Sequence, residues 1–233
     1  MVDCVLHFEG QSDLQYRMLR VVKNRFGAVN ELSVFDMTDQ GLKEVINPAT
    51  IFLDRYGEAV AGSVVMVSRN GVRPFLVEVQ ALVSKTENVP RQLILGLEYN
   101  RLTLLLTIMK EQANVDILEH NVYVNIVGGL KITETASDLA VLLACVSSLK
   151  NQPLPHDMAV FGEVGLSGEI RSVPNAQERI KEAQKNGFKT IVVPKVNQPT
   201  QPIGSMKVIA VEYLYQVLQA VFEQNGEELR PVG

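Results

Sequence analysis

Residues that build familiar kinds of site are scarce in this chain. It has no tryptophan in 233 residues, and its two cysteines, Cys4 and Cys145, lie far apart with no C-x-x-C pair. Its three histidines, His7, His120 and His156, are equally scattered. Because zinc sites and disulfide frameworks need clustered or paired ligands, we expect neither a metal site nor a disulfide here.

Long apolar runs and a strong charge of either sign are also missing. No apolar run approaches the about 18 residues that a membrane-spanning helix needs, and the chain opens without a basic segment followed by an apolar one. With 46% hydrophobic and 21% charged residues, the composition is that of an ordinary globular protein. We therefore expect a cytoplasmic protein with no membrane partner. The net charge of -4 argues against indiscriminate nucleic-acid binding by the whole chain.

What is present is a mixture of strand and helix patterns, which predicts an α/β (α+β) fold. In the first 55 residues, 3–10 reads as a strand and 31–45 as two short strands around a turn, whereas 15–26 fits a strand or a helix equally well. An Asn-Pro turn signal follows, and we place a domain boundary between residues 55 and 56.

From residue 56 to residue 233 the patterns are clearer. Asn70-Gly71 divides 62–83 into the two strands of a hairpin. Apolar spacing predicts helices over 97–113, 135–150, 175–188 and 212–226, the second of them apolar nearly all round and so buried. Shorter apolar segments predict strands over 121–130, 157–164 and 189–194.

Five motifs carry a family resemblance: VKNRFG, VEVQALV, NVYVNIVGGLKITE, FGEVGLSGEIR and GFKTIVVPKVN. In this order, and through nearly the whole chain, they resemble the RadA (Sms) family of bacterial DNA-repair proteins. A complete member has a four-cysteine zinc finger, a RecA-like ATPase core and a domain shaped like the Lon protease domain, a fold shared with the second domain of a ribosomal protein. The resemblance implies a C-terminal fragment, in which 1–55 are the last strands of the core and 56–233 the Lon protease-like domain.

The phosphate-binding loop of the ATPase core is not in this sequence. No G-x-x-x-x-G-K-S/T motif occurs, nor any Gly-Lys dipeptide. Since that loop supplies the backbone amides and the lysine that hold ATP phosphates, the chain by itself should bind no cofactor. The resemblance assigns ATP and magnesium to the complete protein, and zinc to its finger.

Lys23 and Arg25 belong to the family's K-N-R-F-G motif. The resemblance implies that this motif lies at a subunit boundary of a ring, where its cations reach the ATP held by the neighbouring subunit. An inserted arginine can neutralise the charge that spreads over the γ-phosphate oxygens during transfer. The alternative for the pentapeptide alone is a solvated cationic strand end.

Active Lon proteases use a Ser-Lys dyad, and the resemblance places its two positions at Ala136 and Gln177. Alanine has no nucleophile, and glutamine cannot accept a proton at useful pH, so the domain should be an inactive protease. A displaced dyad of Ser137 and Lys181 is the alternative. It is disfavoured because a shift of one residue turns a side chain by about 100° around a helix.

A cationic region offers candidate DNA contacts. Residues 66–110 contain six cations and three anions. Phosphate contacts by such cations give salt-dependent affinity without reading sequence. The candidates are Arg69, Arg73, Lys85, Arg91 and Arg101, of which Arg101 opens an apolar helix and has a structural role as its alternative.

The resemblance also implies partners: single-stranded or branched DNA, other copies in a hexameric ring, and a recombinase of the RecA type. The expected role is that of a ring-forming, DNA-binding scaffold in an ATP-dependent protein that processes branched recombination intermediates. Two other roles remain open at this point, a peptidase with the displaced dyad and an oligomerisation module without DNA contacts.

Overall fold

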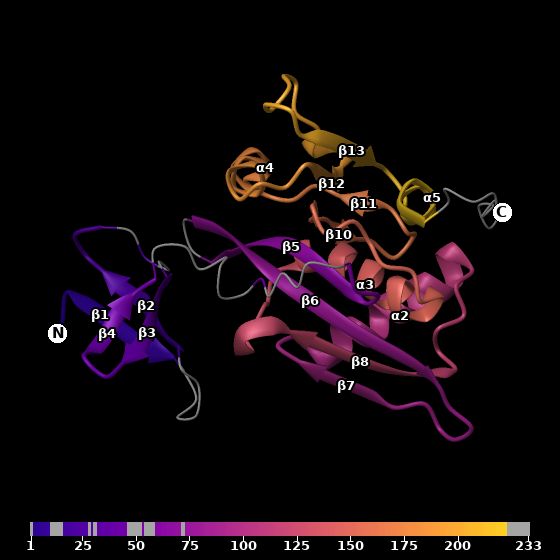
Figure 1. Ribbon diagram of the computed structural model, residues 1–233, viewed down its shortest axis with the longest axis horizontal. Coiled ribbons are helices and arrows are strands. Elements are labelled where there is room, and N and C mark those ends of the chain that lie inside the picture. The colour runs from indigo at the N-terminus through magenta and orange to yellow at the C-terminus, as the bar shows by residue number, and fades with distance from the viewer. Residues whose placement is uncertain are drawn as a thin grey trace.

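The computed structural model contains two separate β-sheet units, a small sheet at the N-terminal end and a larger domain with helices on its sheet (Figure 1). It describes residues 2–9, 16–27, 29, 32–45, 53, 59–70 and 73–222, without the side chains of Glu9, Tyr16, Met18, Leu32, Asn70 and Arg73. The predicted boundary between residues 55 and 56 lies outside these residues.

The small sheet is antiparallel throughout, in the order β1-β2-β3-β4. Its strands are β1 (Cys4–Glu9), β2 (Tyr16–Asn24), β3 (Leu32–Thr38) and β4 (Gly41–Glu44). The ambiguous segment 15–26 is therefore a strand. The two short strands predicted within 31–45 are confirmed, and the turn between them ends at Gly41, whose φ of 105° is one that few other residues adopt.

The larger domain is built on a mixed sheet of seven strands in the order β13-β12-β9-β5-β6-β8-β7. Four of its neighbouring pairs are parallel, and β6 pairs antiparallel with both β5 and β8. The strands are β5 (Ser63–Asn70), β6 (Arg73–Lys85), β7 (Gln92–Leu95), β8 (His120–Ile126), β9 (Met158–Val160), β12 (Thr190–Pro194) and β13 (Lys207–Val211). A small hairpin of β10 (Glu163–Val164) and β11 (Ile170–Arg171) lies beside it.

The long strand β6 shows how the sequence creates two sheet faces. Its alternate residues Val77, Val79 and Ala81 are buried in the main core, whereas Glu78 and Gln80 point to the opposite face. The predicted hairpin with β5 is confirmed, with Asn70 paired to Arg73 across the turn. The edge strands β7 and β13 were not predicted, since each is short and lacks a regular alternation.

Helices cover both faces of the seven-stranded sheet. Buried residues of α2 (Tyr99–Ala113), α3 (Asp138–Lys150) and α5 (Leu214–Phe222) share one core, and those of α4 (Ala176–Lys185) share another on the opposite face. The expectation that α3 is buried on all sides is confirmed, because every residue from 138 to 147 is buried. Short 3-10 turns occur at η1 (Val127–Gly129), η2 (Thr135–Ser137) and η3 (Lys195–Asn197). None of the described helices combines the length and apolar character needed to span a bilayer.

Candidate functional site

The two predicted dyad positions lie near an open depression where η2 meets the start of α4. The depression, here called the Ala136 depression, has a volume of about 650 Å³. Its lining residues come from the end of β5, the segment 133–136, the turn 173–175 and α4. Arg69, Glu134, Ala136 and Arg179 are among them.

An ion pair between buried Arg179 and half-buried Glu134 forms one wall of the Ala136 depression. Arg179 is only 2% exposed, and its guanidinium donates to both carboxylate oxygens of Glu134, over 3.2 Å to Oε1 and 2.6 Å to Oε2. The same guanidinium donates to the carbonyl oxygens of Val67 and Pro174, at 2.6 and 3.1 Å, and its carbon lies 5.8 Å from the centre of the Phe161 ring. With four hydrogen bonds from the guanidinium, this pair joins β5, η2 and α4.

Local sequence explains why an arginine is buried in α4. The helix presents one face to the core, and that face consists of Ala176, Arg179, Ile180 and Ala183, which follow helical spacing. A cation in this stripe is tolerated only if its charge is compensated. Glu134 provides that compensation, and its Oε1 also accepts hydrogen bonds of 2.7 Å from the Ser68 hydroxyl and the Arg69 amide.

The two dyad positions differ in their surroundings. Ala136 is buried at the floor of the depression, and its carbonyl oxygen accepts a 3.0 Å hydrogen bond from the Gly162 amide. Gln177 is exposed on the first turn of α4 and does not line the depression. Two of the polar side chains that line it, Glu134 and Arg179, form an ion pair, which is not the pairing of a nucleophile with an adjacent base.

The alternative dyad is not brought together either. Ser137 is 3% exposed, and its hydroxyl donates to the Glu134 carbonyl oxygen over 2.8 Å. Lys181 lies on the exposed side of α4, and the Ser137 hydroxyl is bonded to the backbone and not to this lysine. A base must reach the proton that it abstracts, so this arrangement lacks the geometry of a Ser-Lys peptidase.

A buried carboxylate, that of Asp138, begins α3 next to the depression. The Arg101 guanidinium donates to both of its oxygens, over 2.9 Å from Nε to Oδ1, and the Val164 amide donates to Oδ2 over 3.1 Å. Burial raises the pKa of the Asp138 carboxyl, against the opposing influence of these donors. Hydrogen bonding to Asp138 raises the pKa of Arg101.

This ion pair bears on Arg101 as a candidate DNA contact. Its side chain is 27% exposed, and its donors are directed to Asp138 and to the Val164 carbonyl oxygen. The geometry therefore favours the structural role that was the alternative for this residue. Arg69 is likewise engaged, 3.9 Å from the Glu178 carboxylate.

Two other candidate cations have more open surroundings. Lys85 ends β6 and Arg91 precedes β7, so both lie at the base of the loop that joins these strands, and both are exposed. The Arg91 backbone is fixed by a 3.0 Å hydrogen bond from its amide to the Asn121 side chain. The Arg73 side chain lies outside the described part of the structure.

The K-N-R-F-G motif is located at the end of β2. Lys23 donates to the Val2 carbonyl oxygen over 2.7 Å, and Arg25 donates to the Asp3 carboxylate over 3.1 Å. The Arg25 side chain is 71% exposed despite this ion pair, and Phe26 beside it is 81% exposed. The motif is thus held against the start of β1, with its arginine and its aromatic ring directed to solvent.

Comparisons with known proteins define the class to which the chain belongs. A family model described as subunit ChlI of Mg-chelatase matches residues 105–197, which is less than half of the chain. Together with the sheet, this match places the chain among mixed α/β proteins with a parallel-rich sheet.

Similar proteins identify the family. The chain is 58% identical over 224 residues to the DNA repair protein RadA of Pseudomonas aeruginosa, covering 96% of this chain and 49% of that protein. RadA of Escherichia coli is 51% identical over 95% of this chain, and RadA of Bacillus subtilis 40% over 94%. The chain belongs to the RadA family of DNA repair proteins and is a C-terminal part of such a protein, as predicted. It spans about half the length of these relatives.

Proposed function

We propose that this chain is the ring-forming, DNA-binding part of an ATP-dependent protein for DNA repair and recombination. In this proposal, residues 1–55 complete a RecA-like ATPase core, and residues 56–233 are a Lon protease-like domain without protease activity. The observation that supports it is the site: Ala136, to which the resemblance assigns the nucleophile position, is buried beside the Glu134–Arg179 ion pair, in a chain related to DNA repair proteins.

Loss of protease chemistry can be tested on the chain directly. The purified protein should neither cleave casein nor react with a serine-directed fluorophosphonate, because Ser137 is buried and bonded to a backbone oxygen. The restored variant Ala136→Ser with Gln177→Lys should also stay inactive, since the oxyanion donors and the groove need accurate placement. Cleavage by the unmodified chain that disappears in Ser137→Ala would contradict the proposal.

The K-N-R-F-G motif is proposed to act on ATP and magnesium bound by the neighbouring subunit of the complete protein. There, Arg25→Ala should leave nucleotide binding nearly unchanged and lower hydrolysis by about 10³-fold or more, as loss of an inserted arginine does. Lys43→Ala, an exposed cation on β4, is the matched control. Hydrolysis by Arg25→Ala at the parental rate would remove the motif from the mechanism.

The scaffold role predicts assembly and salt-dependent DNA binding. Light scattering should show a closed oligomer, with a hexamer expected, and single-stranded or branched DNA should bind more weakly as salt rises. Replacing both Lys85 and Arg91 by alanine should weaken DNA binding and lower its salt dependence, whereas Lys207→Ala should not. An assembled protein with no DNA affinity at low salt would instead indicate an oligomerisation module. A RecA-type recombinase is the proposed protein partner in the cytoplasm.

A further inference from the structure

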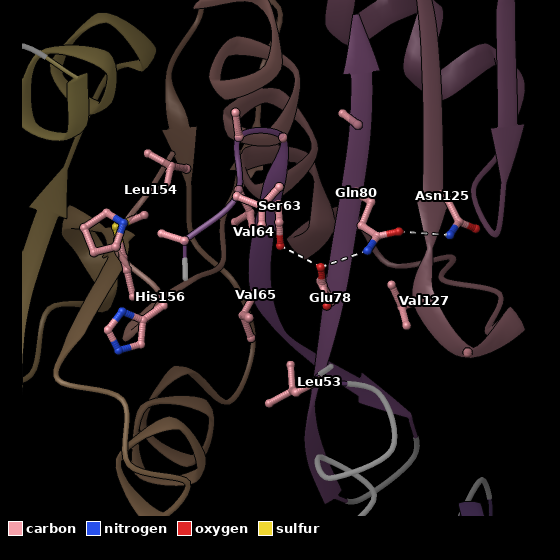
Figure 2. Close-up of a pocket in the computed structure, with 18 residues that line it drawn as sticks. Leu53, Ser63, Val64, Val65, Glu78, Gln80, Asn125, Val127, Leu154 and His156 are labelled. Atoms are coloured by element: carbon pink, nitrogen blue, oxygen red, sulfur yellow. Dashed lines mark hydrogen bonds between the residues drawn. The ribbon is translucent and has the colours of Figure 1, made fainter. Parts of the chain in front are cut away.

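A second pocket lies on the seven-stranded sheet, on the face opposite α2 and α3. Figure 2 shows its lining, which includes Ser63, Glu78, Gln80 and Asn125 from three adjacent strands. The volume is about 550 Å³, and the other lining residues include the segment 59–65 and Leu154, Pro155, His156 and Met158. None of the residues proposed to act in ATP hydrolysis, DNA binding or proteolysis contributes to this cavity, here called the Glu78 pocket.

A buried carboxylate forms the polar centre of the Glu78 pocket. Glu78 is 7% exposed, and one of its oxygens, Oε1, accepts hydrogen bonds from the Ser63 hydroxyl at 2.7 Å and from the Gln80 amide at 3.0 Å. Gln80 in turn accepts a 3.4 Å hydrogen bond from Asn125, so a polar row crosses three strands (Figure 2). These bonds fix the direction of the carboxylate.

The other oxygen, Oε2, is bonded to no donor among the described residues. Oε2 is also not fully enclosed by protein. Among the described residues, one fully enclosed side-chain nitrogen or oxygen lacks a hydrogen-bond partner, and that atom is Nδ1 of His120. Oε2 therefore faces the open volume of the pocket, with a lone pair available to a ligand.

The charge of Glu78 is also uncompensated within the described part of the chain. No lysine or arginine there lies within ion-pair distance of its carboxylate. Among the described residues that line the pocket, the other titratable side chain is that of His156, which is exposed. A buried carboxylate without a cation lowers stability, so its compensation by a bound cation would be favourable.

We propose that the Glu78 pocket binds a guanidinium or ammonium group, which donates to Oε2 of Glu78. The chemistry of the lining favours an organic cation over a hard metal ion, since calcium and magnesium prefer about six or more oxygen ligands and the pocket offers one carboxylate. The apolar walls from Val65 and Leu154 suit the methylene groups of a lysine or arginine side chain or of a small amine. The group can come from another copy of the chain or from a free amine. This proposal does not depend on the function proposed above.

Binding can be measured with butylguanidinium and butylammonium as probes and with neutral butylurea as a matched control. Calorimetry or amide chemical shifts should show saturable binding of both cations to the monomeric protein, and binding of butylurea weaker by about tenfold or more because it lacks the charge. Glu78→Gln should weaken binding of the cations by about tenfold or more, since the amide is nearly isosteric but neutral.

Two variants keep this test decisive. Glu87→Gln removes a carboxylate of the same type from the exposed loop after β6 and should leave probe binding unchanged. Ser63→Ala removes one donor to Oε1 but preserves the carboxylate, and should keep at least part of the binding. Equal binding of butylguanidinium by the wild-type protein and by folded Glu78→Gln would overturn the proposal.

Sedimentation equilibrium distinguishes the two sources of the cation. If the cation is a side chain of another copy, Glu78→Gln should raise the dissociation constant of the assembly by about tenfold, and butylguanidinium should compete with assembly. If it is a free amine, assembly should be unaffected while probe binding is still lost. The proposal would be contradicted if the monomeric protein bound neither probe and if Glu78→Gln left assembly unchanged. Those two results together would exclude both a free amine and a side chain of another copy as the ligand.

Discussion

Two glutamates of the larger domain, the half-buried Glu134 and the buried Glu78, have opposite surroundings. Glu134 meets the Arg179 guanidinium at both oxygens and accepts two further hydrogen bonds. Glu78 accepts two hydrogen bonds at one oxygen and faces a pocket with the other. Glu134 therefore links β5 to α4, whereas Glu78 keeps one oxygen available for binding.

The difference shows why burial of a charge does not by itself indicate function. A completely bonded pair contributes mainly structural specificity, and removal of one partner is costly because the other charge remains buried. An uncompensated carboxylate at a pocket surface should behave in the opposite way: its neutralisation should cost little stability but weaken ligand binding. The four predictions below test this contrast.

The largest effect is expected from Arg179→Met. Methionine fills much of the space but leaves Glu134 without its cation, and four donor contacts disappear. The free energy of unfolding should fall by about 3–5 kcal/mol, measured by urea denaturation. Lys181→Met, on the exposed side of the same helix, should change it by less than about 0.5 kcal/mol. A loss below about 1 kcal/mol for Arg179→Met would mean that the pair is not structural.

A double-mutant cycle should show strong coupling within that pair. Glu134→Gln alone leaves the Arg179 charge uncompensated, whereas combination with Arg179→Met leaves two neutral groups. The double variant should therefore be more stable than the sum of the single losses predicts, by about 1–3 kcal/mol. Additive losses in urea denaturation would show that the two side chains act independently.

The paired carboxylate Asp138 predicts a pH dependence of stability. Burial raises its folded-state pKa above the unfolded value, so its contribution is complete below the unfolded pKa and is lost as pH rises through the folded pKa. Asp138→Asn removes this titration but keeps an acceptor for Arg101. From about pH 4 upward, the stability of the wild-type protein should fall relative to that of the variant. A difference that stays constant with pH would contradict the raised pKa.

The smallest change is expected from Glu78→Gln, and in the opposite direction. The amide can still accept from Ser63 and Gln80 at Oε1, while the uncompensated charge is gone. The free energy of unfolding should stay the same or rise by up to about 1 kcal/mol, with Glu87→Gln as the control. A loss above about 2 kcal/mol would show that the charge of Glu78 is already compensated.

Periodicity predicted the regular elements of the fold well. The alternation in 62–83 and the helical spacing in 97–113 gave β5, β6 and α2 nearly to their ends. The edge strands β7 and β13 were not predicted. Each has only four or five residues, and polar and apolar residues do not alternate regularly in its sequence. Segment 15–26 stayed ambiguous because β-branched and long residues suit both structures.

The contacts of the site could not be predicted in the same way. Ala136 and Gln177 came from resemblance, and their roles remain proposals. The Glu134–Arg179 pair joins residues 45 positions apart, so only the packing of α4 on the sheet reveals it. Arg179 did leave a signal, since it lies in the apolar stripe of an amphipathic helix. Glu78 and Gln80 also left one, because they alternate with buried valines in VEVQALV.

The burial of helix α3 limits which amino-acid substitutions this domain can tolerate. With every residue from 138 to 147 buried, this part of the helix has no side on which a new side chain could project into water; exposure begins only in the last turn, which ends at Lys150. Ser147 is bound as tightly as the apolar residues, because its hydroxyl accepts from the Gly62 amide and donates to the Gln152 carbonyl oxygen. A randomised library over α3 should therefore return very few folded clones, whereas one over the exposed positions of α4 should return many. Labels and tags therefore belong on the exposed positions of α4.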